Sequence, residues 1–382
     1  MRIVVLGYLV RGPVGGMAWH HLQYVLGLAR LGHEVCFVED SDDYPSCYDP
    51  SRHVVDKDPS YGLRFAADAF KRIGLDDQWA YFDAHRSEWR GPGGIATEDF
   101  CRSADVVLNV SGVNPLRDWT ANAPVRAFID TDPVFTQVRN ITDDSARKRT
   151  LDHNSFFTFA ENVRSGSARI PDDGIAWRAT RQPVVLDIWK VRPAAPQGPY
   201  TTVMQWQSYP PVEYEGKRYG TKADSFPEFI ELPRRVKVKL EVALGGSDTP
   251  REMLRQCGWQ IRNPLEAARS PQDFMNYVTQ SRGEIAVAKQ AYVVSNSGWF
   301  SERSAGYLAS GRPVVTQQTG FSEWLPTGNG LIGFTNLEEA ATALEMIEND
   351  YPTHASQARA IAEQHFDSST VLSALLKEVS GD

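Results

Sequence analysis

The sequence predicts an α/β fold made of two doubly wound parallel sheets. Short apolar runs typical of buried parallel strands recur along the chain, and segments with helical periodicity separate them. This alternation stops once, at the proline-containing stretch 191–200, and then starts again. We therefore expect two α/β units that face each other across a cleft, with the linker between them near residue 191.

The first unit opens with a β-α-β pattern. Residues 2–6 form an apolar run, and a glycine-rich loop follows. Leu22, Val25, Leu26 and Ala29 then recur at the spacing of one helix face. The other elements expected in this unit are strands at 34–39, 104–110, 125–129 and 156–159, and a helix at 62–73.

The second unit repeats the alternation with other lengths. Its expected strands are 201–206, 236–244, 291–294 and 313–316. Its expected helices are 226–232, 251–257, 274–280, 303–309, 336–349 and 353–379. Ligands of open parallel sheets bind beyond the carboxyl ends of the strands, so the cleft between two such units is the expected site.

Composition excludes several classes of protein. The 382 residues include 42% hydrophobic and 23% charged residues, as in ordinary globular proteins. The net charge of −8 disfavours a nucleic acid partner. Four cysteines lie far apart at 36, 47, 101 and 257, which favours a reduced, cytoplasmic protein without a metal site. The opening residues read as a strand rather than a signal peptide, and no apolar run reaches the roughly 20 residues of a membrane span.

The segment 297–321 carries the clearest chemistry. Ser301 is placed to cap a helix whose first turn contains Glu302, Arg303 and Ser304. A helix N-terminus attracts anions, and the arginine fork suits phosphate. The strand that follows ends in the turn Thr319-Gly320-Phe321, at the same edge of the sheet.

This segment, with its Gly-Arg-Pro-Val-Val at 311–315 and the following Thr-Gly-Phe turn, resembles the donor domain of GT-B glycosyltransferases. Gly15-Gly16, the helix after them and Gly32-His33-Glu34-Val35 resemble the amino-terminal domain of the same fold. The resemblance implies two Rossmann-like domains: an acceptor-binding domain 1–190 and a donor-binding domain 191–360. It also implies that residues 361–382 form a helix packing back toward the first domain.

The activity implied is a hexosyltransferase that moves a sugar from a UDP- or dTDP-type donor to a hydroxyl or amine of a small molecule or saccharide. The resemblance implies no metal and no cofactor beyond the nucleotide sugar. In many retaining members an acidic residue stands where this chain has Gly306, and Glu302 lies one turn earlier. Inverting and retaining outcomes therefore both stay open, as does the oligomeric state.

Candidate site residues follow from these motifs. Gly15, Gly16, Trp19 and Asp130 are expected to contact the acceptor, and His20, Asp132 or His153 to act as the base. Lys222 is a further candidate in the loop after residue 206. The residues expected to bind the donor are Ser208, Ser281, Glu284, Lys289, Trp299, Ser301, Glu302, Arg303, Ser304, Thr319, Gly320 and Phe321.

Two other functions fit the same motifs. A sugar-nucleotide epimerase of this fold would share the donor pocket but need no acceptor. A non-catalytic protein that binds nucleotide sugars would bind without turnover, and fold alone does not decide among the three.

Overall fold

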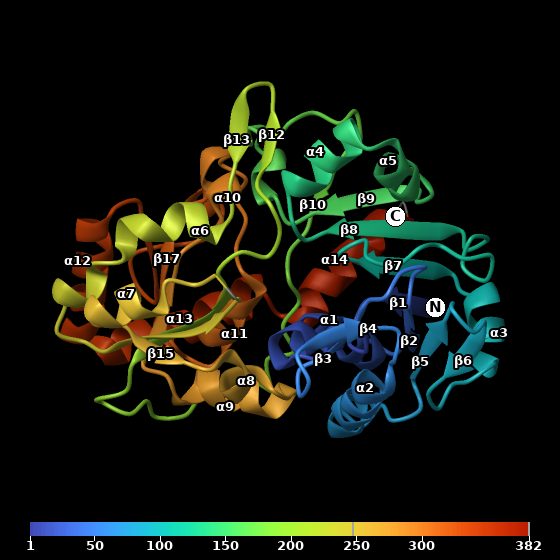
Figure 1. Ribbon diagram of the computed structural model, residues 1–382, viewed down its shortest axis with the longest axis horizontal. Helices are drawn as coiled ribbons and strands as arrows, with labels where there is room; N and C mark the ends of the chain where they lie inside the picture. Colours follow the sequence, from blue (N-terminus) through green and yellow to red (C-terminus); the bar gives the residue numbers. More distant parts are fainter. Residues whose placement is uncertain (247, 381–382) are drawn as a thin grey trace.

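The computed structural model describes residues 1–246 and 248–380. Its frame is two sheets, one on the right and one on the left of Figure 1. Residues up to Ala179 form the first sheet, and residues from Tyr200 onward form the second. The break between them contains the expected linker, while the division into domains at residues 190 and 191 stays a prediction.

The first sheet has eight strands in the order β10-β9-β8-β7-β1-β2-β5-β6. All neighbours are parallel except β6, which pairs antiparallel with β5 at the edge. Its strands are β1 (Arg2–Leu6), β2 (Glu34–Asp40), β5 (Trp79–Asp83), β6 (Glu88–Arg90), β7 (Val106–Val110), β8 (Val125–Asp130), β9 (Ser155–Thr158) and β10 (Arg178–Ala179).

The second sheet has six parallel strands in the order β15-β14-β11-β16-β17-β18. They are β11 (Tyr200–Gln205), β14 (Leu240–Gly245), β15 (Gln260–Arg262), β16 (Gly283–Ala286), β17 (Val314–Gln317) and β18 (Leu331–Phe334). Two small hairpins stand outside the sheets, β3 (Cys47–Asp49) with β4 (Val54–Asp56) and β12 (Val212–Tyr214) with β13 (Lys217–Tyr219).

Helices connect the strands of both sheets. With the first sheet belong α1 (Gly15–Arg30), α2 (Ser60–Arg72), α3 (Ala96–Arg102), α4 (Phe135–Thr142) and α5 (Asp144–Leu151). With the second belong α6 (Lys222–Ser225), α7 (Arg251–Gln256), α8 (Pro264–Ala268), α9 (Pro271–Gln280), α10 (Gln290–Val294), α11 (Glu302–Ala309) and α12 (Leu337–Asn349). The described chain closes with α13 (Tyr351–His365) and α14 (Ser368–Ser380).

One buried apolar cluster joins the two halves. It runs from the strands of the first sheet through α1 to side chains of α9, α11, α13 and α14. At Gly27 of α1, a Cβ would come within 2.5 Å of Leu372, so α14 packs directly on α1 (Figure 1). In the part of the chain that the structure describes, no helix is both long and apolar enough to cross a bilayer.

Three sequence predictions of secondary structure were wrong. Residues 291–294 lie in α10, and the neighbouring strand is β16, because a four-residue apolar run does not distinguish a helix from a strand. Residues 226–232 fall in two short 3₁₀ turns, Phe226–Phe229 and Leu232–Arg234, each with a proline near its start, rather than in one continuous helix. The segment 353–379 is two helices, because the backbone at Asp367 leaves the helix to bridge Val184.

Candidate active site

A cavity of about 1340 Å³ lies where the two sheets face each other. Its first wall comes from segments that follow β1, β7 and β8, together with the start of α1. Its second wall comes from segments that follow β11 and β14, together with α6 and the start of α11. The cavity therefore occupies the position at the carboxyl ends of parallel strands where ligands of such sheets bind.

The second wall presents a helix N-terminus and a fixed arginine. Ser301 caps α11 by accepting a hydrogen bond from the Arg303 backbone N–H at 3.2 Å. The Arg303 Nε donates to buried Glu284, and Nη1 donates to the Val203 carbonyl at 2.9 Å. Nη2 makes no hydrogen bond with any of the described residues. Glu284 is fully buried and does not line the cavity, so it orients Arg303 rather than contacting a ligand.

Lys222 adds a second cation to this wall. It begins α6 and lines the cavity, and none of the carboxylates in the described ranges forms an ion pair with it. Burial, with the charge of Arg303 as the next cause, lowers the pKa of Lys222 to about 7. Because burial makes this ammonium costly to charge, an anion next to it would stabilise the charged form.

The far end of the second wall was not predicted from the sequence. Gly245 and Gly246, the segment 261–265, Arg251 and Arg255 all line the cavity. Arg251 is already engaged, since it donates to the carbonyls of Leu244 and Gly246 at 2.9 and 3.0 Å. The only sequence signal here was the Gly-Gly pair after a predicted strand.

Asp132 is the centre of a network that crosses the cleft. Its carboxylate lies 2.9 Å from the Lys289 Nζ and accepts hydrogen bonds from the hydroxyls of Tyr209 and Tyr292. Lys289 also donates to the Tyr209 hydroxyl. Asp132 belongs to the first wall and the other three residues to the second. Lys289, which the sequence predicted to bind the donor, therefore forms its ion pair with Asp132 among the described side chains.

His20 lies in the first wall, in the second turn of α1. Its Nδ1 is 2.7 Å from Gln182 Oε1 and its Nε2 is 3.3 Å from Ser111 Oγ. Burial lowers the pKa of His20, so the ring is neutral at pH 7. Ser111 lies in left-handed backbone at φ 66°, which is uncommon for a residue other than glycine.

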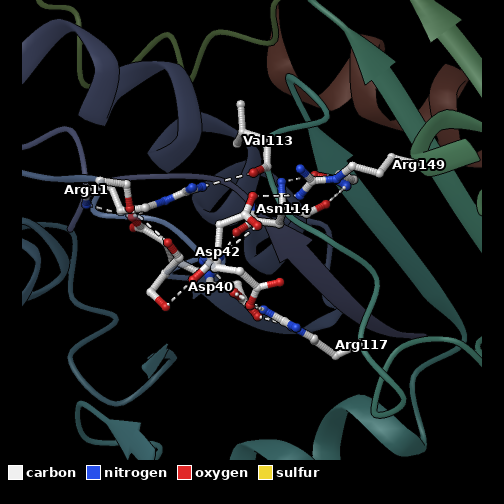
Figure 2. A network of polar contacts seen from close by, with 12 residues as sticks. Arg11, Asp40, Asp42, Val113, Asn114, Arg117 and Arg149 are labelled. Carbon is white, nitrogen blue, oxygen red and sulfur yellow. Dashed lines mark hydrogen bonds and ion pairs between the residues drawn. The ribbon is translucent and has the colours of Figure 1, made fainter. Parts of the chain in front are cut away.

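A network of ion pairs holds the loops of the first wall together, as Figure 2 shows. The buried Glu39 carboxylate accepts the backbone N–H groups of Leu9, Val10 and Arg11. Asp40 forms a two-pronged pair with Arg117 at 2.9 and 3.0 Å.

The same network ties neighbouring loops to one another. Asp42 pairs with Arg149 at 2.7 Å, and Arg11 donates to the Val113 carbonyl at 3.0 Å (Figure 2). Val113 lines the cavity, as does Tyr8, whose ring faces the Arg11 guanidinium. The network therefore fixes the shape of the first wall, although no pattern in the sequence indicated it.

Several predicted site residues do not line the cavity. Ser281 donates to the Tyr277 carbonyl at 2.7 Å, and Ser304 is fully buried. His153 is buried, with Nδ1 on the carbonyls of residues 149 and 150 and Nε2 3.1 Å from the Asn109 amide. Burial lowers the pKa of His153 to about 4. Asp130 accepts from the Asp132 N–H, Thr136, Gln137 and Thr158, so it shapes the turn that carries Asp132.

Two glycine motifs serve packing between the halves. In the first motif, a Cβ on Gly15 would lie 2.1 Å from the Ser270 carbonyl oxygen, so α1 and the start of α9 meet closely there. Trp19 donates to the Pro271 carbonyl at 2.8 Å across the same contact. In the second motif, Gly320 has φ 90° and is covered by Asn162 and Asn296, while Thr319 bonds the Trp299 carbonyl and Phe321 packs against Phe300.

The predicted residues that do line the cavity form one group. They come from both walls and include two of the three candidate bases and the cations expected to bind the donor. They are Gly16, Trp19, His20, Asp132, Ser208, Lys222, Lys289, Trp299, Ser301, Glu302 and Arg303.

Comparison with known proteins gives matches in structure only. No protein-family model matches the chain, and no curated protein sequence matches it. AviGT4, a glycosyltransferase involved in avilamycin A biosynthesis, is 14% identical with a TM-score of 0.55, covering 99% of this chain and 96% of its own. An alpha-glucosyltransferase in complex with UDP-glucose and DNA is 11% identical with a TM-score of 0.58, covering 100% and 99%.

A third structure has the same arrangement. It is Anabaena Alr3699/HepE in complex with UDP-glucose, 12% identical with a TM-score of 0.55, covering 100% of this chain and 99% of its own. These matches extend over the whole length of the chain, but at 11–14% sequence identity they show a shared fold and not a shared activity. The two parallel sheets around a central cleft are those of the GT-B glycosyltransferases, and this chain has that fold.

Proposed function

We propose that the protein is a glycosyltransferase that takes a sugar from a nucleoside-diphosphate sugar. The observation that carries this proposal is the cation pair Arg303 and Lys222, beside the capped N-terminus of α11, in the cleft between the sheets. These groups provide an arginine fork, an ammonium and free helix N–H groups, which together suit a diphosphate. They would bind the donor and stabilise the leaving diphosphate as its charge develops.

The structural neighbours support a uridine nucleotide, because two of them were solved with UDP-glucose. In this arrangement the diphosphate lies against Arg303 and Lys222, and the nucleoside extends toward Gly245 and the segment 261–265. The network that holds Lys289 on Asp132 would have to open if Lys289 is to reach the diphosphate.

The volume of the cleft favours transfer over a reaction of the donor alone. Typical small-molecule pockets have about 300–1000 Å³, and this one has about 1340 Å³. Its first wall presents His20, Ser111 and Tyr48, beyond the groups assigned to the donor. A small-molecule or saccharide acceptor there would fit the net charge of −8 better than DNA, although one neighbour was solved with DNA.

His20 is the proposed base. Of the three candidates from the sequence, His153 does not line the cavity and Asp132 is paired with Lys289. A neutral His20 can take the proton of an acceptor hydroxyl on Nε2. The hydroxyl oxygen then forms the bond to the anomeric carbon, and the bond from that carbon to the diphosphate oxygen breaks with its electron pair on the oxygen.

A nucleotide panel tests the proposal. UDP, dTDP, GDP, ADP and the matching nucleotide sugars are added to the protein, and the melting temperature is measured. A ligand that binds only the folded state raises it by mass action. We expect one nucleoside diphosphate to stabilise the protein selectively, and no stabilisation by any of them would refute the donor site.

Turnover then separates the three functions. The preferred nucleotide sugar is incubated with and without a panel of small-molecule and saccharide acceptors. Release of nucleoside diphosphate that depends on an acceptor supports transfer. Release of free or isomerised sugar without an acceptor supports the epimerase alternative, and binding without any release supports the non-catalytic one.

A further inference from the structure

Gln182 lies outside every motif of the sequence, yet it contacts the proposed base directly. It is buried, it follows β10, and its Oε1 lies 2.7 Å from Nδ1 of His20. The two residues are separated by 162 positions in the sequence. Their contact is made only when α1 packs against the segment that leaves the first sheet.

The amide of Gln182 can lie in only one orientation. Its Nε2 donates to the backbone carbonyls of His20 and Pro183, at 3.3 and 3.1 Å. Carbonyl oxygens only accept hydrogen bonds, so the NH₂ group must face them. Rotating the amide by 180° would place oxygen against both carbonyls. Gln182 Oε1 therefore faces His20, and because this oxygen only accepts, Nδ1 of His20 carries the proton.

The tautomer places the free lone pair of His20 at the cleft. With the proton on Nδ1, a neutral ring has its lone pair on Nε2. Nε2 faces Ser111 Oγ at 3.3 Å, and Ser111 Oγ lies 2.8 Å from Thr131 Oγ1. Ser111 and Thr131 both line the cavity. The lone pair thus points toward hydroxyl groups at the position where an acceptor hydroxyl would arrive.

We propose that Gln182 is a positioning residue that fixes His20 as the Nδ1–H tautomer and directs its Nε2 lone pair at the acceptor. This role rests on the proposed function, in which His20 takes the acceptor proton. Because the Gln182 amide carries no charge, it orients the His20 ring without favouring the imidazolium, and the ring stays neutral until it takes the proton. The charged or titratable groups that face His20 are Glu302 across the cleft, and His21 and Tyr24 on α1.

Nitrogen-15 NMR of the histidine side chains tests the proposal without any substrate. The His20 signals are assigned by their loss in His20→Gln. We expect the wild-type protein to show Nδ1 protonated and Nε2 unprotonated at pH 7. A protonated Nε2 in the neutral ring of the wild type would overturn the proposal, and this result needs no variant of Gln182 to fold.

Two variants of Gln182 sharpen the test. In Gln182→Glu the carboxylate favours the imidazolium, so the titration of His20 should move up by about one pH unit or more. In Gln182→Leu the tautomer is no longer selected, and both forms should be populated. An unchanged titration in Gln182→Glu, with the protein folded, would contradict the proposal.

Gln23 provides a matched control on the same helix. It is buried to a similar extent and accepts from the Val185 N–H and the Trp189 indole at 2.9 and 3.0 Å. Gln23→Met removes a buried amide of the same kind, so it should lower stability while leaving the tautomer and titration of His20 as they were.

Activity separates the two proposals. If transfer is found, Gln182→Glu should move the acidic limb of the kcat/KM profile up with the titration of His20. If no nucleotide sugar reacts although His20 has the expected tautomer, the proposed function fails. Gln182 then still orients the His20 ring, but its proposed role in catalysis is refuted. If transfer occurs with an unmoved profile, the positioning role fails and the function stands.

Discussion

The two walls of the cleft differ in how completely their charged side chains are paired. In the first wall, three carboxylates meet three arginines: Glu39 lies 3.4 Å from Arg11, and Asp40 and Asp42 pair with Arg117 and Arg149. In the second wall, Lys222 forms no ion pair with a described carboxylate, and Arg303 has only Glu284.

This difference indicates that the two walls have different roles. Buried charges cost free energy unless they are paired, and a paired set holds its loops in one geometry. The first wall therefore has the paired charges expected of a rigid frame, and under the proposed function it would hold the acceptor. In the second wall Lys222 has no ion pair with a described carboxylate, and under the proposed function a diphosphate would supply the anion beside it.

Breaking the frame of the first wall should have the largest effect. Glu39→Ala leaves three backbone N–H groups and Arg11 without the carboxylate that they share. Breaking a buried charge pair costs about 3–5 kcal/mol. We expect a loss of that size in the free energy of unfolding measured in urea, with little change in the affinity of the folded protein for UDP.

Glu34→Ala is the control for this variant, because Glu34 pairs with Arg2 at an exposed site where ion pairs contribute little. A loss below about 1 kcal/mol in Glu39→Ala would mean that the network does not hold the wall.

Removing the arginine fork of the second wall comes next. Arg303→Ala should weaken UDP binding about 100-fold, since a hydrogen bond between charged groups, such as one from Nη2 to the diphosphate, is worth about 2–3 kcal/mol. Arg303→Lys keeps the charge without the fork and should recover part of the loss. Arg117→Ala removes a guanidinium from the opposite wall and should leave UDP affinity unchanged. Equal losses in Arg117→Ala and Arg303→Ala would erase the distinction between the walls.

Lys222 should make donor binding depend on pH. Its pKa of about 7 means that about half of the molecules must take up a proton when a diphosphate binds at neutral pH. Affinity for UDP should therefore fall as pH rises, by about fivefold from pH 7 to pH 8. Calorimetry in two buffers of different ionisation enthalpy measures the proton uptake, and Lys222→Met should abolish both effects. Affinity that is flat between pH 7 and pH 8 would contradict the role of Lys222.

Local patterns in the sequence predicted the strands that flank the site and the capped helix at Ser301. They also singled out Arg303, Glu302 and His20, which line the cavity, because strand ends and helix starts have local signals. Residues that act through packing gave no such signal. Glu284 looked like a ligand contact from its sequence and is instead buried under Arg303.

The contacts that organise the site join distant positions. Gln182 meets His20, and Asp132 meets Lys289, only after the halves have packed together. Likewise, Gly15 and Gly320 were expected to approach ligands and instead allow close contacts between segments of the protein. A glycine in a loop shows that something comes close to the backbone, but not whether it is a ligand or another part of the chain.

The smallest expected effect concerns the network that spans the two walls. Asp132→Asn keeps the shape of the side chain but removes the charge that holds Lys289. The released ammonium should turn to the diphosphate and tighten UDP binding about threefold, a typical gain for a partly screened charge. Lys289→Met should lose this gain, and Asp132→Asn should add nothing in that background. A fall in kcat of several orders of magnitude in Asp132→Asn, with UDP affinity unchanged, would instead identify Asp132 as the base in place of His20. The residue that links the two walls would then also carry out the proton transfer.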